Sequence, residues 1–317
     1  MPDEPQSVTP DQSDAIEERC GPVLDPILLI VAILWGGNFV AYKYLMNLVS
    51  ASGLLALRCT LITAMLLVVL ALRGRLRSGN SRGMWLRIGL AGVLVMGLQQ
   101  VCFVTGLDLT AAGEGSLLFS TAPIFTALIA AALGYERISL ANWVGIAAAM
   151  VGCALVILGG EGAEHVPPTR VKGDLFMIAS SICYALFMVI SGPLMRRYGA
   201  LKVLTFSFFF ALPVILPFGL ADALADDWAS IGLIGWVSLF WVVVLAGTVG
   251  FTAWYWRISR TSASRVAVYQ YFVPVVAMIT AALLLSERPA ALQILGAGFV
   301  LLGLYFARRR DAANCPT

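Results

Sequence analysis

The chain contains a long internal repeat, in which residues 113–156 match residues 264–307 at an offset of 151 positions. Eight of the 44 aligned positions are identical: Pro123 and Pro274, Ala130-Ala131 and Ala281-Ala282, Leu133 and Leu284, Glu136-Arg137 and Glu287-Arg288, Gly145 and Gly296, and Gly152 and Gly303. Each copy reads as an apolar segment with a central proline, a charged turn, and a second apolar segment with regularly spaced glycines. In a strongly apolar chain, such a repeat indicates a transporter built from two homologous halves.

The composition identifies a membrane protein, because 60% of the 317 residues are hydrophobic and only 12% are charged, against about 25% charged in soluble domains. A membrane-spanning helix needs about 20 mostly apolar residues. Ten segments meet this requirement: 27–47, 53–72, 85–106, 113–133, 141–159, 173–194, 203–220, 233–256, 265–285 and 291–307. The sequence therefore predicts an all-α membrane protein with ten transmembrane helices.

The residues outside these segments show no sign of an enzyme or a metal site. Residues 1–26 are acidic and proline-rich, which predicts a disordered cytoplasmic tail. The six cysteines form no CxxC pair, and the single histidine, His165, lies in a loop. We therefore expect no metal, no cofactor and no catalytic residue. The partners expected are a small-molecule substrate and the lipid bilayer, and the sequence leaves the oligomeric state open.

The basic residues predict the orientation, because cytoplasmic loops carry the excess of Lys and Arg. With the N-terminus inside, 16 basic residues fall in inner loops and four in outer loops. Both termini are thus expected to be cytoplasmic, in the inner (plasma) membrane, and the net charge of +3 requires no nucleic-acid partner. The repeats 27–159 and 173–307 each hold five helices, and this odd number inverts the second half relative to the first. The prediction is two inverted five-helix repeats around a central cavity.

Polar residues inside the segments are candidates for contact with a substrate. Asn38 follows a glycine pair near the middle of the first segment, where glycine permits either close helix packing or a local break. Gln99 and Gln100 lie near the centre of the third. Neighbouring helical residues point about 100° apart, so only one of these glutamines is expected to face a cavity. For all three amides, bonding between helices is the alternative to contact with a substrate.

Arg58 lies within the second segment, five residues from its start. An intramembrane charge indicates function by default. Two interpretations stay open: Arg58 contacts an anion or takes part in gating, or it forms a structural ion pair with an outer carboxylate such as Glu114 or Asp174.

The repeated prolines, Pro123 and Pro274, are predicted to break a backbone hydrogen bond in mid-helix and to act as hinges. Three and seven residues before them lie Ser120 and Ser116 in the first copy, and Tyr271 and Ala267 in the second. This stripe is the expected lining of the pathway, with a purely structural kink as the alternative. Tyr184 and Tyr255 lie on similar polar stripes of the sixth and eighth segments, although Ser and Thr in such stripes often bond their own backbone.

Nearly the whole chain, from about residue 26 to residue 308, resembles the EamA-type ten-helix branch of the drug/metabolite transporter superfamily. The resemblance rests on the run 34–40, on Leu57-Arg58, and on each proline with its following Glu-Arg pair. It implies inverted five-helix repeats, a cavity formed by helices 1–4 and 6–9, and peripheral helices 5 and 10. It also implies export of amino acids or related small metabolites by alternating access. The alternative is an importer, or a carrier of sugars or nucleotide derivatives.

The sequence also predicts a neutral binding pocket, since its carboxylates lie at segment ends. A pocket built from Asn38, Tyr184, Tyr271 and one of the two glutamines has no group that could carry a proton. Facilitated efflux down the gradient of the substrate is the expected mode of transport.

Overall fold

The computed structural model describes residues 25–74, 82–134, 168–260, 268–285 and 290–308, residue 266, and short pieces of 143–155. These residues are helical, with turns and no strand. Within this part of the chain, seven helical stretches are long and apolar enough to cross a membrane: Pro26–Met46, Ala51–Leu72, Arg82–Leu109, Ala112–Ala132, Thr169–Tyr198, Ala200–Ala225 and Trp228–Arg260. The apolar helix Phe272–Leu284 is shorter. Most of the predicted segment 141–159 lies outside the described residues.

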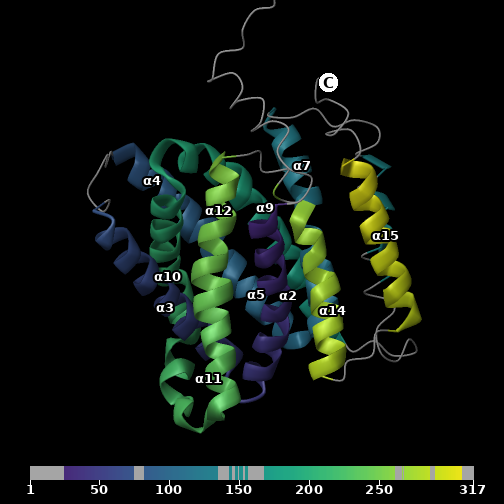
Figure 1. Ribbon diagram of the computed structural model, residues 1–317, viewed down its shortest axis with the longest axis horizontal. Helices are drawn as coiled ribbons and strands as arrows, with labels where there is room; N and C mark the ends of the chain where they lie inside the picture. The colour runs from purple at the N-terminus through teal and green to yellow at the C-terminus, as the bar shows by residue number, and fades with distance from the viewer. Residues whose placement is uncertain are drawn as a thin grey trace, which may run out of the picture.

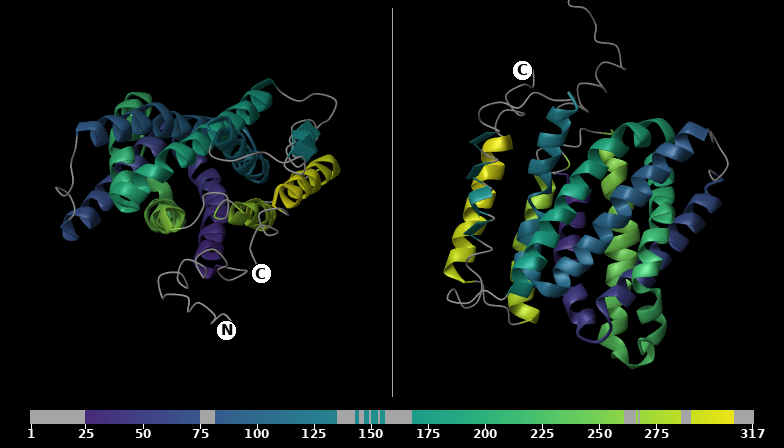
Figure 2. Two further views of the ribbon diagram at one scale, coloured as in Figure 1. Left: turned by 90° about the horizontal axis from the view of Figure 1, so that it is seen from above. Right: turned by 180° about the vertical axis from the view of Figure 1, so that it is seen from behind.

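The helices run up and down in one bundle, with α2 between α12 and α14 (Figure 1). The elements before residue 135 are α2 (Pro26–Met46), α3 (Ala51–Leu72), α4 (Arg82–Leu90), η1 (Ala91–Gly97), α5 (Leu98–Leu109), α6 (Ala112–Phe119) and α7 (Ala122–Ala132). Those after residue 167 are α9 (Pro168–Tyr198), α10 (Ala200–Ala225), η2 (Trp228–Ile231), α11 (Gly232–Phe240), η3 (Trp241–Gly250), α12 (Phe251–Arg260), η4 (Val268–Tyr271), α14 (Phe272–Leu284) and α15 (Ala291–Arg308). Figure 2 shows α15 at the edge of the bundle, next to α14.

Local sequence explains where the first two helices begin. The Asp25 carboxylate accepts hydrogen bonds from the backbone N–H groups of Ile27 and Leu28, and Pro26 occupies the first helical position of α2. The Ser50 hydroxyl accepts from the N–H of Gly53 at the start of α3. Such caps satisfy N–H groups that have no partner within the helix, and proline is tolerated at the first position because its N–H is not needed there.

The glycine pair in α2 serves close packing, since the helix continues through it without a break. A Cβ atom built on Gly36 would lie 2.5 Å from Cβ of Val276, and one on Gly37 would lie 3.1 Å from the Trp241 ring. Of the two roles predicted for these glycines, the structure therefore shows the close approach of neighbouring helices.

The repeated prolines lie at the starts of helices, and the predicted mid-helix kink is wrong. α6 ends at Phe119 and α7 begins at Ala122, with Pro123 in its first turn. In the second copy the 3-10 turn η4 precedes α14, whose first turn contains Pro274. A proline in the first turn of a helix removes an N–H that has no intrahelical acceptor. Each proline therefore lies just after the point where one helical piece ends and the next begins.

Two π-helical segments lie at matching places, one in the stretch Arg82–Leu109 and one in the stretch Trp228–Arg260. η1 begins at Ala91 and η3 at Trp241, 150 positions apart. Within the described residues, the internal repeat thus extends to local backbone geometry upstream of its most similar stretch. A π segment shifts the faces of the helix around it, and such segments are frequent at functional sites.

Contacts between helix ends join residues that the charge pattern places on the same side of the membrane. Asp25 pairs with Arg257, and both belong to the predicted inner side. On the predicted outer side, the Ser50 hydroxyl donates to Asp226 at 2.7 Å and Lys43 donates to the backbone carbonyl of Asp108 at 3.0 Å. This alternation fits the predicted order of crossings.

Candidate functional site

A cavity lies between helices from the two halves of the chain. Aromatic side chains form much of its wall: Trp35, Phe39, Phe103, Phe119, Tyr184 and Phe251. Four amides and one cation also line it: Asn38, Gln99, Gln100, Gln270 and Arg58. The remaining lining residues are Ala246, Gly247 and Val273. The cavity has a volume of about 40 Å³. One water molecule needs about 10–15 Å³ of such volume. The cavity can therefore hold several waters or part of a small solute.

Two of the amides have polar atoms without a partner among the described residues. The Asn38 side-chain oxygen is buried and makes no hydrogen bond, and the same is true of both the oxygen and the nitrogen of the Gln270 amide. An unsatisfied buried polar group costs about 1–3 kcal/mol. Such groups beside a cavity are suited to bind a polar ligand or water.

The two neighbouring glutamines both line the cavity, so the expectation that only one would do so is wrong. They bond to helices on different sides of α5. The Gln99 amide donates to the Ser180 hydroxyl of α9 at 3.1 Å, and the Gln100 oxygen accepts from Arg58 of α3 at 2.5 Å. Neighbouring side chains point about 100° apart, and the cavity wall is wide enough to include both of them.

Arg58 is almost completely buried and lines the cavity. Its guanidinium donates to Gln100 and lies 5.2 Å from the centre of the Tyr42 ring. The predicted ion pair with Glu114 or Asp174 is not what the structure shows, because these carboxylates bond to Arg170 and Thr110. The predicted neutral pocket is also wrong, since the cavity wall contains a buried cation.

Aromatic contacts connect α2 to the second half of the chain across the cavity. The rings of Trp35 and Tyr184 meet edge to face with centres 6.4 Å apart, and Phe119 lies 5.3 Å from Tyr184. The Trp35 indole N–H also donates to the Ala246 carbonyl, within the π segment η3, at 3.1 Å. These contacts give the aromatic wall a defined shape.

Three residues of the predicted lining, Ser116, Ser120 and Tyr255, are not among the residues that the structure places at the cavity. The Ser116 and Ser120 hydroxyls donate to the carbonyls of Gly113 and Ser116 in their own helix, at 2.6 and 2.8 Å. Tyr255 lies behind the wall, packed against Phe187 and Phe251. The side chain of Tyr271 lies outside the described part of the structure.

The sequence analysis missed Gln270 and the aromatic residues of the wall other than Tyr184. Gln270 and Phe119 correspond to each other in the internal repeat, and each lies four residues before a repeated proline. The predicted stripe used the position three residues before, which is on the same helical turn. A comparison of both positions in the two copies would have drawn attention to Gln270, the one amide among these four residues.

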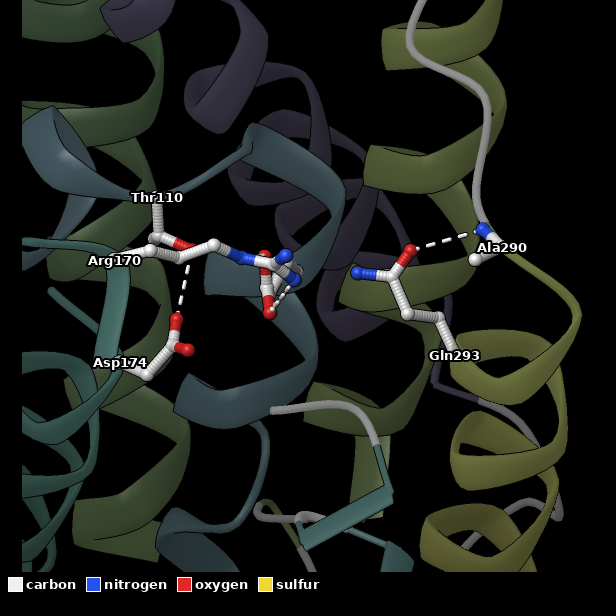
Figure 3. A network of polar contacts seen from close by, with 6 residues as sticks. Thr110, Arg170, Asp174, Ala290 and Gln293 are labelled. Atoms are coloured by element: carbon white, nitrogen blue, oxygen red, sulfur yellow. Dashed lines mark hydrogen bonds and ion pairs between the residues drawn. The ribbon is translucent and has the colours of Figure 1, made fainter. Parts of the chain in front are cut away.

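A second group of polar residues connects α5, α6 and α9 near their ends (Figure 3). Arg170 binds both carboxylate oxygens of Glu114, at 3.0 and 2.5 Å, and Thr110 donates to Asp174 at 2.8 Å. The side chain of Glu114 is 2% exposed. A bidentate pair of this kind holds two helix ends in a fixed geometry. At the opposite end, the Tyr269 hydroxyl accepts from the backbone N–H of Asp25 at 2.6 Å, beside the contact between Asp25 and Arg257.

Comparisons with known proteins agree with this architecture. A protein of Streptantibioticus cattleyicolor named "Probable terminal-alkyne amino-acid exporter" is 26% identical over 283 residues, covering 89% of this chain and 92% of that protein. A "Probable amino-acid metabolite efflux pump" of Escherichia coli is 28% identical over 287 residues, covering 88% and 92%. A solved structure described as "Crystal structure of protein" superimposes with a TM-score of 0.65 at 20% identity, covering 90% of this chain and 96% of that one. The last likeness shows the fold alone.

The profile of the "EamA-like transporter family" matches the chain twice, over residues 25–158 and 171–309. The two matches include the described residues that line the cavity. The resemblance noted from the sequence is thereby confirmed. Together with the long apolar helices, it shows a multi-pass membrane transporter, and the chain belongs to the EamA-like transporter family.

Proposed function

We propose that this transporter exports amino acids or closely related small metabolites across the plasma membrane, and that the central cavity is its substrate site. The observation that carries the proposal is the cavity between the two halves, with buried and unpaired amide atoms of Asn38 and Gln270 in its wall. Small ligands bind in such sites, where apolar walls surround a few polar groups. The names of two relatives as amino-acid or amino-acid-metabolite exporters support the substrate class.

Within the cavity, Asn38 and Gln270 are the groups proposed to bond the substrate directly. Gln99 and Gln100 already bond to neighbouring helices, so their proposed role is to shape the site and to exchange these bonds when substrate enters. Tyr184 contributes its ring to the aromatic wall. Aromatic faces accommodate apolar side chains and also attract cations, as a carrier of varied amino acids requires.

Alternating access is proposed to arise from two inverted five-helix repeats, residues 27–159 and 173–307, preceded by a cytoplasmic tail. The matched prolines and the matched π segments support two copies of one unit. Asp25 and Asp174, 149 positions apart, stand near the starts of the first helices of the two copies. Inverted repeats that rock against each other expose one site to each side of the membrane in turn.

The polar groups at the two ends of the bundle are proposed to act as gates. One consists of Asp25, Arg257 and Tyr269, and the other of Thr110, Glu114, Arg170 and Asp174. The breaks between α6 and α7 and between η4 and α14, next to Pro123 and Pro274, are the proposed hinges, because helix ends can absorb changes in backbone angles.

Labelling with a membrane-impermeant maleimide tests the inverted topology. In a variant without the six native cysteines, Ala229→Cys should react in intact cells and Ser78→Cys only after permeabilisation. Equal reaction at both positions in intact cells would contradict the topology.

Transport by the purified protein tests the function. Proteoliposomes are loaded with the 20 common amino acids, and each amino acid released is measured by mass spectrometry against protein-free vesicles. Protein-dependent release of a subset is the expected result. Release of none, together with release of sugars or nucleosides from vesicles loaded with them, would replace the proposed substrate class. If deletion of the gene lowers the uptake of amino acids by the cells, the protein is instead an importer.

A further inference from the structure

The wall of the cavity contains a buried cation that the proposed neutral contacts do not use. Arg58 is 3% exposed. Among the residues that the structure places around the cavity, it is the only charged one. A guanidinium has five N–H donors, and one of those of Arg58 reaches the Gln100 oxygen. Its buried Nε has no hydrogen-bond partner among the described residues. The cation therefore retains capacity for an acceptor.

The two carboxylates that the sequence offered as partners of Arg58 bond to other residues. Glu114 is bound by Arg170, and Asp174 accepts from Thr110. Arg170 pairs with Glu114 and Arg257 with Asp25, and Arg58 takes part in neither of these ion pairs. A buried charge without a counter-ion is strongly unfavourable, and the oxygen of one amide and the face of the Tyr42 ring compensate it only in part. An anionic group in the cavity would complete the compensation.

We propose that the cavity recognises solutes through a free carboxylate group, which binds the Arg58 guanidinium. The inference rests on the proposed function, since it names the group of the substrate that this site reads. Arginine suits this role because its planar fork of donors matches a carboxylate. Gln100 holds the guanidinium from one side, and the buried Nε has no partner among the described residues, so it can donate to the substrate. Arg58 is thus a specificity-determining residue.

The unpaired amide oxygens provide the complementary half of a zwitterion site. The side-chain oxygens of Asn38 and Gln270 lie in the same wall and can accept from an ammonium group. Aromatic faces around them add a cation–π attraction. A ligand with both a carboxylate and an ammonium group satisfies the cation and the acceptors together. An amine without the carboxylate leaves the buried cation uncompensated and adds a second positive charge.

The decisive measurement compares amino acids with their amides, which differ in the carboxylate alone. Proteoliposomes are loaded with L-leucine, L-phenylalanine and L-methionine, or with L-leucinamide, L-phenylalaninamide and L-methioninamide, and protein-free vesicles correct for leakage. At least one amino acid should leave at least ten times faster than its amide. Equal protein-dependent rates for every pair would overturn the role of the carboxylate while the proposed export function stands. If neither set leaves and none of the other common amino acids does, the proposed function itself fails.

Substitution of the cation provides a second test. Arg58→Gln should slow release of the amino acid at least tenfold and leave release of its amide unchanged or faster, whereas Arg58→Lys should retain part of the amino-acid activity. Arg87→Gln removes an exposed arginine of α4 and serves as the matched control. Unchanged amino-acid release by folded Arg58→Gln would overturn the proposal, and so would an equal loss for amino acid and amide. If Arg58→Gln does not fold, the comparison of amino acids and amides in the unmodified protein decides whether the carboxylate is recognised.

Discussion

Phe119 and Gln270 line the same cavity from equivalent positions of the internal repeat, each four residues before a proline that stands in the first turn of the next helix. One copy thus contributes an aromatic ring and the other an amide. The site is therefore asymmetric although the two copies share one plan. A solute with an apolar part and a polar part can use both.

Replacement of Gln270 by leucine should weaken transport and raise stability. The amide is completely buried and both of its polar atoms lack a partner in the described structure, so its removal relieves a cost of about 1–3 kcal/mol. We expect a higher Tm in detergent and at least about tenfold slower amino-acid release, since a contact worth about 1.4 kcal/mol is lost. Gln293→Leu is the control: the Gln293 oxygen caps α15 by accepting from Ala290 at 3.0 Å, so its Tm should fall while transport persists.

Asn38 and Ser120 are both polar and buried, but the structure predicts opposite outcomes for their removal. Asn38→Leu should reduce amino-acid release roughly tenfold, because the side-chain oxygen in the cavity wall is lost. Ser120→Ala should stay within about twofold of the unmodified protein, because the hydroxyl bonds to a carbonyl of its own helix. Both rates are measured in proteoliposomes at matched protein content. If a Ser120→Ala variant folds normally and does not transport, Ser120 is part of the transport pathway after all.

The ion pair between Glu114 and Arg170 should contribute strongly to stability. Removing one partner leaves the other charge buried, which typically costs about 3–5 kcal/mol, so Glu114→Gln and Arg170→Gln should each lower the Tm markedly. The exchanged pair, Glu114→Arg with Arg170→Glu, should recover part of the loss. Thermal unfolding of the three variants provides the measurement. If the exchanged pair loses as much Tm as the two single variants together, the two side chains do not act together. Transport rates of the folded variants then report on the proposed gate.

Amino-acid efflux should not require a pH gradient. No carboxylate is among the residues that the structure places around the cavity, and arginine keeps its proton throughout. Release down the gradient of the substrate should therefore be as fast with equal pH on both sides of the vesicle membrane as with a pH gradient. Uphill accumulation driven by a pH gradient alone would show that a carboxylate of a gate, such as Asp174 or Glu114, takes part in the cycle.

The sequence by itself determined the class of the protein, its internal repeat and the helical positions of most of its crossings. Hydrophobicity and length suffice for these, because each membrane helix satisfies its own backbone hydrogen bonds. The sequence also drew attention to five residues that line the cavity, because polar or aromatic side chains stand out within apolar segments: Asn38, Arg58, Gln99, Gln100 and Tyr184. Its prediction that the prolines lie in mid-helix was wrong, because the same residue breaks a helix in its interior and is favoured in its first turn.

Only the tertiary structure decided which side chains meet. Helical periodicity places the positions three and four residues before a proline on the same turn, so it could not separate Ser120, which bonds to its own helix, from Phe119, which lines the cavity. The sequence offered Glu114 and Asp174 as partners for Arg58, whereas the packing of α3 against α5 supplies Gln100 and gives Glu114 to Arg170. The hydrophobic pattern of the sequence did not predict the π segments. Each of these outcomes depends on contacts between residues far apart in the chain, which local propensity and spacing do not contain.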